Sequence, residues 1–282
     1  MTTRIIQSSL LFIVCLGFTT NLSAQQVLSA SELAGTYVAG HNFGGSSINL
    51  QADGTYSRDS GACTMATKES GKYFLADGVI HFTILKYTGV QFSDESKEID
   101  LLNPEARKEF FGYKDDEKVD PLKTEFSLLV VKWGERVYLI DESDLRDFSN
   151  AVNLGLEPRP ELRSEPYYGS FFLREGDLQK NVSGKPSLPS EWQTFLLSKP
   201  VTAKIVSLEA QDKTQVATIN RGSQDGLKVG MRLLVKKQVP FLWSSGGEIL
   251  SVEKRTAKVQ VQDLKVGDIL SSKYVSSNPR YR

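Results

Sequence analysis

Two Asp-Gly pairs, each set between runs in which apolar and polar residues alternate, constrain the fold of this chain most strongly. They are Asp53-Gly54 and Asp77-Gly78. Asp-Gly readily adopts the positive φ that a tight hairpin turn needs, and strict alternation is the period of a half-buried strand. Each pair therefore predicts a β-hairpin. In the second hairpin we expect Ile80, Phe82 and Ile84 to share one face.

Further strand patterns continue to residue 140. The most apolar hairpin runs from Phe126 to Trp133, turns at Gly134-Glu135 and returns from Arg136 to Ile140. Counting from Thr36 to Ile140 gives about eight strands, which predicts an antiparallel barrel or a highly curved sheet. One further short strand is expected after the barrel, at residues 170–174.

Three segments carry the signals of short helices. Asn103 and Pro104 predict a helix start, and Gly112 predicts its end. Asp141 predicts the cap of a second helix, which we expect to pack at the side of the barrel. A third helix is expected over residues 191–197.

The last third of the chain repeats the phrase Leu-Lys-Val-Gly. The copies lie at Leu227 to Gly230 and at Leu264 to Gly267, and each is followed by a run that predicts a strand. Two more strands are expected before the first copy, at residues 203–208 and 215–219. Glycine turns that lead into short strands indicate a second, small β-barrel.

The first residues have the pattern of a signal peptide. Arg4 lies in a short basic start, an apolar run extends from Leu10 to Phe18, and Leu22-Ser23-Ala24 precedes Gln25. The run is too short to span a bilayer, and no later segment approaches membrane-spanning length. We therefore expect cleavage near Ala24 and a mature protein that is periplasmic or secreted.

Together these signals predict a mainly β fold with two domains. Residues 25–198 form an antiparallel barrel or curved sheet with about two or three short helices, and residues 199–275 form the small β-barrel. We expect residues 1–24 to be removed as a signal peptide. Residues 276–282 are expected to form a disordered tail.

Both domains resemble known families. With Gly35-Thr36-Tyr37 on its first strand and a helix after the strands, the first domain resembles the lipocalin-like barrels of the calycin group, which usually carry a tryptophan where Tyr37 stands. This resemblance implies an interior cavity for a small apolar ligand. The stretch from Ile219 to Met231 resembles the small β-barrel modules of the rod-shape-determining protein C and flagellar assembly protein T families. That second resemblance implies protein–protein contact in the cell envelope, without a cofactor.

The charges divide unequally between the two parts. Residues 199–282 hold 15 Lys and Arg against 7 Asp and Glu, a net charge of +8 that residues 1–198 balance with −8. Either the two parts attract each other, or the basic part meets an anionic envelope polymer, or the charges form a plain solvated surface. Because we expect export, we predict no nucleic-acid partner.

His41, His81 and Cys63 are the candidates for soft metal ligands or a nucleophile. No spacing brings them together, and the patterns of a calcium loop, a serine elbow and a phosphate-binding loop are absent. We therefore predict no catalytic residue, no metal site and no cofactor, and keep an enzyme of an unrecognised class as an alternative. Cys63 alone remains after cleavage, which predicts a buried small residue, with a reactive thiol or a dimer link as alternatives.

The most suggestive surface lies between Lys236 and Glu248, where an aromatic and apolar triplet stands beside two lysines. Apolar anchors with a basic rim are typical of protein interfaces, although such residues can also cap a barrel core. We predict a non-catalytic protein that acts through contact with an envelope protein or an anionic envelope polymer. A small apolar ligand in the first barrel is the alternative. The predicted contact residues are Arg232, Lys236, Lys237, Phe241, Leu242 and Trp243.

Overall fold

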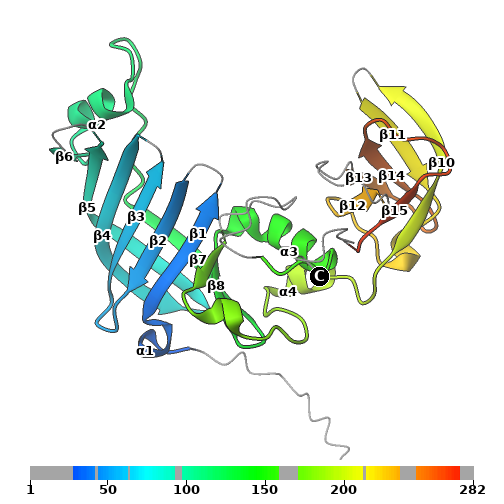
Figure 1. Cartoon of the computed structure of the whole chain (residues 1–282), viewed down its shortest axis with the longest axis horizontal. Coiled ribbons are helices and arrows are strands. Elements are labelled where there is room, and N and C mark those ends of the chain that lie inside the picture. Colours follow the sequence, from blue (N-terminus) through cyan, green and yellow to red (C-terminus); the bar gives the residue numbers. More distant parts are fainter. Residues whose placement is uncertain are drawn as a thin grey trace, which may run out of the picture.

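The computed structural model describes residues 28–41, 44–62, 64–92, 97–158, 171–211, 214–235 and 246–273. In these ranges the chain is mainly β and forms two closed β-barrels, with short helices between them (Figure 1). We call them the first barrel and the second barrel. The predicted fold class, a barrel with short helices followed by a small β-barrel, is confirmed.

The first barrel is a ring of antiparallel strands. Its members are β1 (Gly35–His41), β2 (Gly44–Leu50), β3 (Thr55–Ala62), β4 (Met65–Ala76), β5 (Val79–Gln91), β7 (Glu125–Trp133), β8 (Arg136–Ile140) and β9 (Phe172–Arg174). Around the ring the order is β4-β3-β2-β1-β9-β8-β7-β5, and the pairing of β5 with β4 closes it.

The predicted strand count is confirmed, but the membership of the ring differs from the prediction. Strand β6 (Lys97–Asp100) pairs with the C-terminal part of β5, residues 88–91, and lies outside the ring. Its place is taken by β9, which joins β8 to β1 and which the sequence put after the barrel. Strand β9 is 3 residues long, too short for an alternating pattern to mark it as a barrel strand.

The turns follow the predicted chemistry. Asp77 and Gly78, with φ of 52° and 77°, alone connect β4 to β5, as a tight hairpin requires. The loop between β2 and β3 spans residues 51–54, and there only Gly54 has a positive φ, of 82°. Gly134, at 60°, turns β7 into β8. All three predicted hairpins are confirmed.

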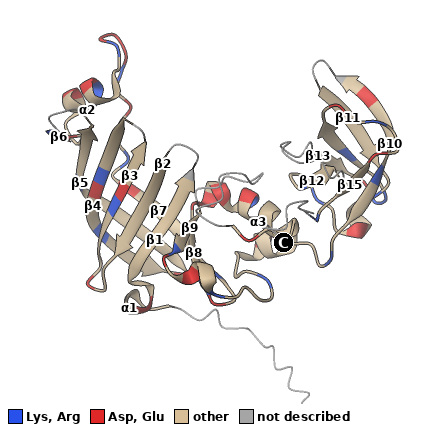
Figure 2. Ribbon diagram, viewed as in Figure 1, with Lys and Arg blue, Asp and Glu red and all other residues tan. Residues whose placement is uncertain are grey.

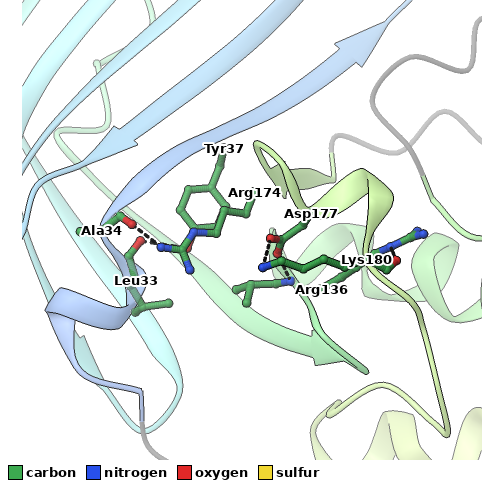
Figure 3. A network of polar contacts seen from close by, with 8 residues as sticks. Leu33, Ala34, Tyr37, Arg136, Arg174, Asp177 and Lys180 are labelled. Carbon is green, nitrogen blue, oxygen red and sulfur yellow. Dashed lines mark hydrogen bonds and ion pairs between the residues drawn. The ribbon is translucent and has the colours of Figure 1, made fainter.

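Alternate residues of the strands fill the barrel with an apolar core. Helix α1 (Ala30–Leu33) lies at one end of this core, where Leu33 is fully buried and its carbonyl accepts a hydrogen bond of 2.9 Å from the Tyr37 hydroxyl. Arg174 donates to the carbonyl of Ala34 beside it (Figure 3). The inward core residues are Tyr37, Ala39, Ile48, Leu50, Tyr56, Tyr73, Ile80, Phe82, Leu128, Val130, Val137, Leu139 and Phe172.

Helix α3 (Leu145–Asn153) packs on the outside of the first barrel. It follows a 3₁₀ turn, η1 (Glu142–Asp144), whose start is capped by the Asp141 carboxylate at 2.9 Å from the Ser143 N–H. Leu145 and Phe148 then pack against outward residues of β7, β8 and β9, and the Phe148 ring lies 5.2 Å from that of Tyr138. All five residues of β8 are buried, because one face lines the barrel and the other meets this helix.

A buried carboxylate ties the chain after β9 to strand β8 (Figure 3). Asp177, 1% exposed, accepts a hydrogen bond of 2.9 Å from the Val137 N–H and lies 2.6 Å from the Lys180 ammonium. Arg136 donates from Nε to the Lys180 carbonyl at 2.8 Å and pairs with Glu157 at 3.0 Å. These contacts hold the 3₁₀ turn η2 (Asp177–Gln179) in place and fix the entry to the next helix.

The two remaining helices also match the sequence. Helix α2 (Pro104–Phe111) is capped by Asn103, whose Oδ1 accepts from the Glu105 N–H at 3.0 Å, and ends at Gly112 in the left-handed region. Helix α4 (Ser190–Phe195) lies between the two barrels, where Trp192 packs against the core of the second barrel and against the apolar cluster on the outside of the first.

The second barrel is a smaller antiparallel ring around its own apolar core. Its strands are β10 (Thr202–Gln211), β11 (Thr214–Ile219), β12 (Arg232–Val235), β13 (Gly246–Val252), β14 (Ala257–Val261) and β15 (Ile269–Ser271). The order around the ring is β10-β11-β14-β13-β12-β15. The predicted pair β10 and β11 and the strands after both Leu-Lys-Val-Gly copies are confirmed.

The repeated phrase belongs to a larger duplication. Strands β10, β11 and β12 correspond in order to β13, β14 and β15, and β10 and β13 carry a register shift at the same place, after Ile205 and after Ile249. The Gly267 N–H bonds to the Ile205 carbonyl at 2.9 Å, and the Gly230 N–H bonds to the Ile249 carbonyl at 2.9 Å. The second barrel is thus built from two interlocked, equivalent halves.

Candidate functional site

Two places in the structure gather polar groups that the fold alone does not explain. The first lies inside the first barrel, on strands β2, β3 and β4. The second lies at the two Leu-Lys-Val-Gly copies of the second barrel. The residues of the first place, which we call the polar cluster, are Ser46, Tyr56, Arg58, Ser60 and Glu69.

Strand alternation directs the polar cluster into the barrel. Tyr56 of β3 and Tyr73 of β4 belong to the interior core, so residues an even number of positions away share their inward face. Arg58 and Glu69 therefore face inward, and they stand opposite each other in the register of β3 and β4. Figure 2 shows basic and acidic segments side by side on these two strands.

Arg58 and Glu69 form a partly buried ion pair. The Arg58 Nη1 lies 3.7 Å from the Glu69 Oε1, with the two side chains 31% and 11% exposed. Arg58 also donates from Nε to the Ser46 Oγ at 3.2 Å, and the Ser46 and Ser60 hydroxyl oxygens are 2.6 Å apart. The Tyr56 hydroxyl donates to the Glu69 Oε1 at 3.4 Å. The cluster is thus one connected network.

Aromatic rings separate this network from the apolar core. The Arg58 guanidinium carbon lies 5.5 Å from the centroid of the Phe126 ring and 5.6 Å from that of Phe172. Both distances are within the range of cation–π attraction. The Phe126 ring in turn stacks on Phe82 at 4.4 Å. The charged pair therefore rests on the top layer of the core.

Burial dominates the electrostatics of the polar cluster. It raises the pKa of Glu69 above the ordinary value of a glutamate, although Arg58 and the Tyr56 hydroxyl act in the opposite direction. Burial and the neighbouring carboxylate raise the pKa of Tyr56 as well. On β5, burial raises the pKa of Tyr87, partly offset by a hydrogen bond from Thr67. Glu69 is therefore a carboxylate that holds its proton more readily than usual.

Helix α2 packs on the same inward face, beyond Tyr87. Gly89 follows Tyr87 by two positions, and a Cβ at Gly89 would lie 2.5 Å from the Phe110 ring of the helix. The missing side chain lets Phe110 sit directly on the strand. Arg107, one turn earlier, is buried and donates to the Asp120 carbonyl at 2.6 Å. The helix thus contributes a second guanidinium near this end of the barrel.

The histidine and cysteine candidates do not come together in the described residues. His81 lies on the outer face of β5, where its Nδ1 is 3.0 Å from the Ser127 Oγ and its ring stacks on Phe74 at 4.8 Å. His41 ends β1, and Cys63 lies outside the described residues. Within the ranges that the structure covers, no group of three or more His, Cys, Asp or Glu is arranged to hold a metal ion.

The predicted contact loop is described only at its start. Lys236, Lys237, Phe241, Leu242 and Trp243 lie outside the described residues. Arg232 begins β12 with an exposed side chain, and its backbone N–H donates to the Oδ1 of Asn150 at 2.9 Å. Its backbone therefore belongs to the contact between the two barrels.

The first Leu-Lys-Val-Gly copy is held by the helices of the first barrel. Asn150 of α3, fully buried, donates from Nδ2 to the Gly230 carbonyl at 3.0 Å and accepts from the Arg232 N–H. The Lys228 ammonium donates to the Thr194 hydroxyl at 2.9 Å. Leu234 of β12 packs with apolar residues at the end of α3. The Asn150 carboxamide thus bonds to the backbone on both sides of Met231, at the Gly230 carbonyl and at the Arg232 N–H.

The second copy has the same local conformation, but among the described residues no helix covers it. Gly267 has a φ of 96°, close to the 83° of Gly230, but Gly230 is buried and Gly267 only half-buried. The third residue of each copy is exposed to the same degree, 58% for Val229 and 60% for Val266. Lys265 is exposed, whereas its counterpart in the first copy bonds to α4. The two copies differ in what covers them.

Sequence reasoning missed both the polar cluster and Asn150. The alternation Tyr56, Arg58, Ser60 after the Asp53-Gly54 turn carried a usable signal, because an inward Tyr56 directs Arg58 inward too. Asn150 carried none, because a polar residue opposite the apolar stripe of a helix is expected to face solvent.

Among the described helices, none is long and apolar enough to cross a lipid bilayer. No protein-family model matches the chain, and neither a curated protein nor a solved structure matches it.

Proposed function

We propose that this protein is an exported, non-catalytic contact protein, which binds an envelope protein through the uncovered half of its second barrel. The observation that carries the proposal is the difference in cover between the two Leu-Lys-Val-Gly copies. The first copy already binds a helix of the same chain through its backbone. The second copy offers the equivalent backbone around Gly267, with Val266 and Lys265 exposed beside it.

The chemistry of the intramolecular contact indicates what the partner presents. Asn150 supplies one buried carboxamide, and Ala151 of the same helix and Leu154 just after it supply apolar contacts. A partner helix with a carboxamide and small apolar residues would suit the second copy in the same way. The net positive charge of residues 199–282 favours a partner with acidic residues around that helix.

The filled core of the first barrel weighs against the carriage of a small apolar ligand. Residues such as Ile48, Ile80 and Leu139 are fully buried against one another inside it. An apolar ligand of ordinary size needs a preformed cavity of about 300 Å³ or more. Such a ligand would have to displace this core.

The test is co-sedimentation of the chain from residue 25 with isolated cell envelope, at low and high salt. We expect Lys265→Glu to weaken binding, because its counterpart Lys228 takes part in the intramolecular contact and the reversed charge would repel an acidic partner. Lys254→Glu is the matched control, since Lys254 is also an exposed lysine of the second barrel but lies outside both copies. A double variant, Phe241→Ala with Trp243→Ala, tests the loop predicted from the sequence.

Loss of binding in the Lys265 variant alone would support the uncovered copy as the contact surface. Loss in the loop variant alone would move the contact to residues 236–248. Sedimentation of none of the proteins with the envelope, at either salt concentration, would contradict the proposed function.

A further inference from the structure

The polar cluster places a charged pair where a barrel of this kind has no structural need for one. Arg58 and Glu69 stand on the inward face, one layer above the packed core. Apolar residues in place of a buried ion pair are often neutral or stabilising, because charges lose their hydration on burial. Ionisable groups with perturbed environments gather at binding sites more often than elsewhere. The pair therefore calls for a functional explanation.

The pairing between Arg58 and Glu69 is loose. Their closest oxygen and nitrogen atoms are 3.7 Å apart, whereas a charge-assisted hydrogen bond is typically about 2.7–2.9 Å long. A guanidinium has five N–H donors, and the described contacts engage the Nε–H with Ser46 and one Nη toward Glu69. Arg58 thus keeps donor capacity for a further acceptor.

On the side away from the core, the positions beside the pair on β2 and β3 are small, whereas Tyr87 and Phe110 lie on the β5 side. In the register of the barrel, the inward positions toward that end include Gly44 and Ser46 on β2 and Ser60 on β3. The core half of the same strands carries Ile48, Leu50 and Tyr56 instead. Arg58 is 31% exposed, so solvent reaches it from this end. A small molecule can therefore approach the guanidinium without displacing the core.

We propose that the polar cluster binds a small organic carboxylate, which replaces Glu69 as the counter-ion of Arg58 while Glu69 takes up one proton from solvent. The ligand carboxylate accepts hydrogen bonds from the guanidinium and from the hydroxyls of Tyr56 and Ser60, which already lie in the network. The protonated Glu69 becomes a further donor. Charge inside the barrel stays balanced, with one anion bound and one carboxylate neutralised.

The charged and titratable groups around Glu69 agree with this exchange. Arg58 and Tyr56 face it from β3 and Tyr87 from β5, while Arg107 of α2 acts on Tyr87. Burial raises the pKa of Glu69, so protonation during binding costs less than for an exposed glutamate. The bound anion raises that pKa further, because it takes over the positive charge that had favoured the ionised form.

The experiment is calorimetric titration of the chain from residue 25 with benzoate, at pH 5, 6, 7 and 8. Binding takes up one proton at Glu69. At pH values above the pKa of Glu69 in the free protein, the association constant should therefore rise by up to about tenfold for each unit by which the pH is lowered. Methyl benzoate, which has the same ring without the charge, is expected not to bind. Equal binding of the ester would overturn the proposal and indicate an apolar site instead.

Two variants locate the site. Arg58→Met is expected to abolish benzoate binding at every pH. Glu69→Gln is expected to bind benzoate at pH 8 at least as tightly as the unmodified protein at pH 5, and without dependence on pH, because the competing carboxylate is gone. Circular dichroism and thermal unfolding show whether each variant keeps the fold.

The chain offers a matched control pair on the outer face of the same barrel. Lys86 and Glu98 are also 3.7 Å apart, but their side chains are 66% and 55% exposed. Lys86→Met and Glu98→Gln should leave benzoate binding and its pH dependence unchanged. Benzoate binding that survives in a folded Arg58→Met protein would overturn the proposal, and so would an absence of binding by the unmodified protein at pH 5. Neither result depends on whether the chain binds an envelope protein.

Discussion

At the scale of single residues, the first barrel requires glycine where the backbone of a neighbouring strand comes too close for a side chain. Gly71 stands at the register shift between β4 and β5, and a Cβ there would lie 1.9 Å from the Thr83 carbonyl oxygen. No side-chain rearrangement relieves a clash with backbone. Gly45 of β2 lies in ordinary strand, and its nearest contact would be the Ala39 carbonyl at 3.5 Å. Position 45 has room that position 71 lacks.

We expect Gly71→Ala to lower the free energy of unfolding by about 1–3 kcal/mol, because the strands must separate to admit the methyl group. Gly45→Ala should change it by less than about 0.5 kcal/mol or stabilise the strand slightly. Urea unfolding followed by circular dichroism measures both. Equal effects of the two variants would show that the bulge adapts to a side chain.

Residue chemistry also sets the limit of what the sequence predicts. Asp77, Gly78 and Gly134 revealed their turns because positive φ has few solutions among amino acids. Asn150 did not reveal its contacts, because its partners are backbone groups 80 and 82 positions away in the sequence. Single residues are enough to predict a local backbone conformation, whereas they do not predict a polar contact with a residue far away in the sequence.

At the scale of elements, helix α3 serves both barrels with opposite faces. Leu145 and Phe148 pack on the first barrel, while Asn150 and Ala151 meet the second. The sequence predicted the helix, because its signals depend on neighbours within one or two turns, but Asp141 caps the 3₁₀ turn before the helix and not the helix itself. It did not predict the second face, since nothing in a periodic pattern tells a domain contact from solvent.

We expect Asn150→Ala to destabilise the contact by about 2 kcal/mol, from two lost hydrogen bonds of about 1 kcal/mol each. The Arg232 N–H donates a hydrogen bond to the Asn150 side chain, so its hydrogen exchange should become faster in this variant. Hydrogen exchange in β11 should not change. Asn150→Asp keeps that acceptor but loses the donor to the Gly230 carbonyl, so its Arg232 N–H should stay more protected than in the alanine variant. Unchanged exchange in Asn150→Ala would contradict this role.

At the scale of the whole molecule, one helix joins the two barrels by its apolar side chains. Trp192 of α4 packs against the core of the second barrel and against the cluster outside the first. Phe195, one turn later, belongs to the core of the second barrel. The sequence signals for two barrels were sufficient to separate them, but not to show that one helix contributes to both.

We expect Trp192→Ala to destabilise both barrels, by about 2 kcal/mol or more in total, because it leaves a cavity between the core of the second barrel and the apolar cluster on the outside of the first. Hydrogen exchange read separately for β7 and β14 should become faster in both strands. Val229→Ala is a suitable control, because that exposed side chain belongs to neither core. Faster exchange in one barrel alone would show that Trp192 supports only that barrel.

The place of β9 in the first barrel has a consequence for how the chain reaches its fold. Tyr37 of β1 pairs with Arg174 of β9, so the ring closes through a contact between residues far apart in the sequence. Contacts of this kind slow folding, because the intervening chain must be ordered before they form. Until Arg174 is available, the earlier strands can form only an open sheet whose outer strands, β1 and β8, lack their partner. Such edges invite pairing with other chains, so a nascent chain is most exposed to aggregation just before its last short strand arrives.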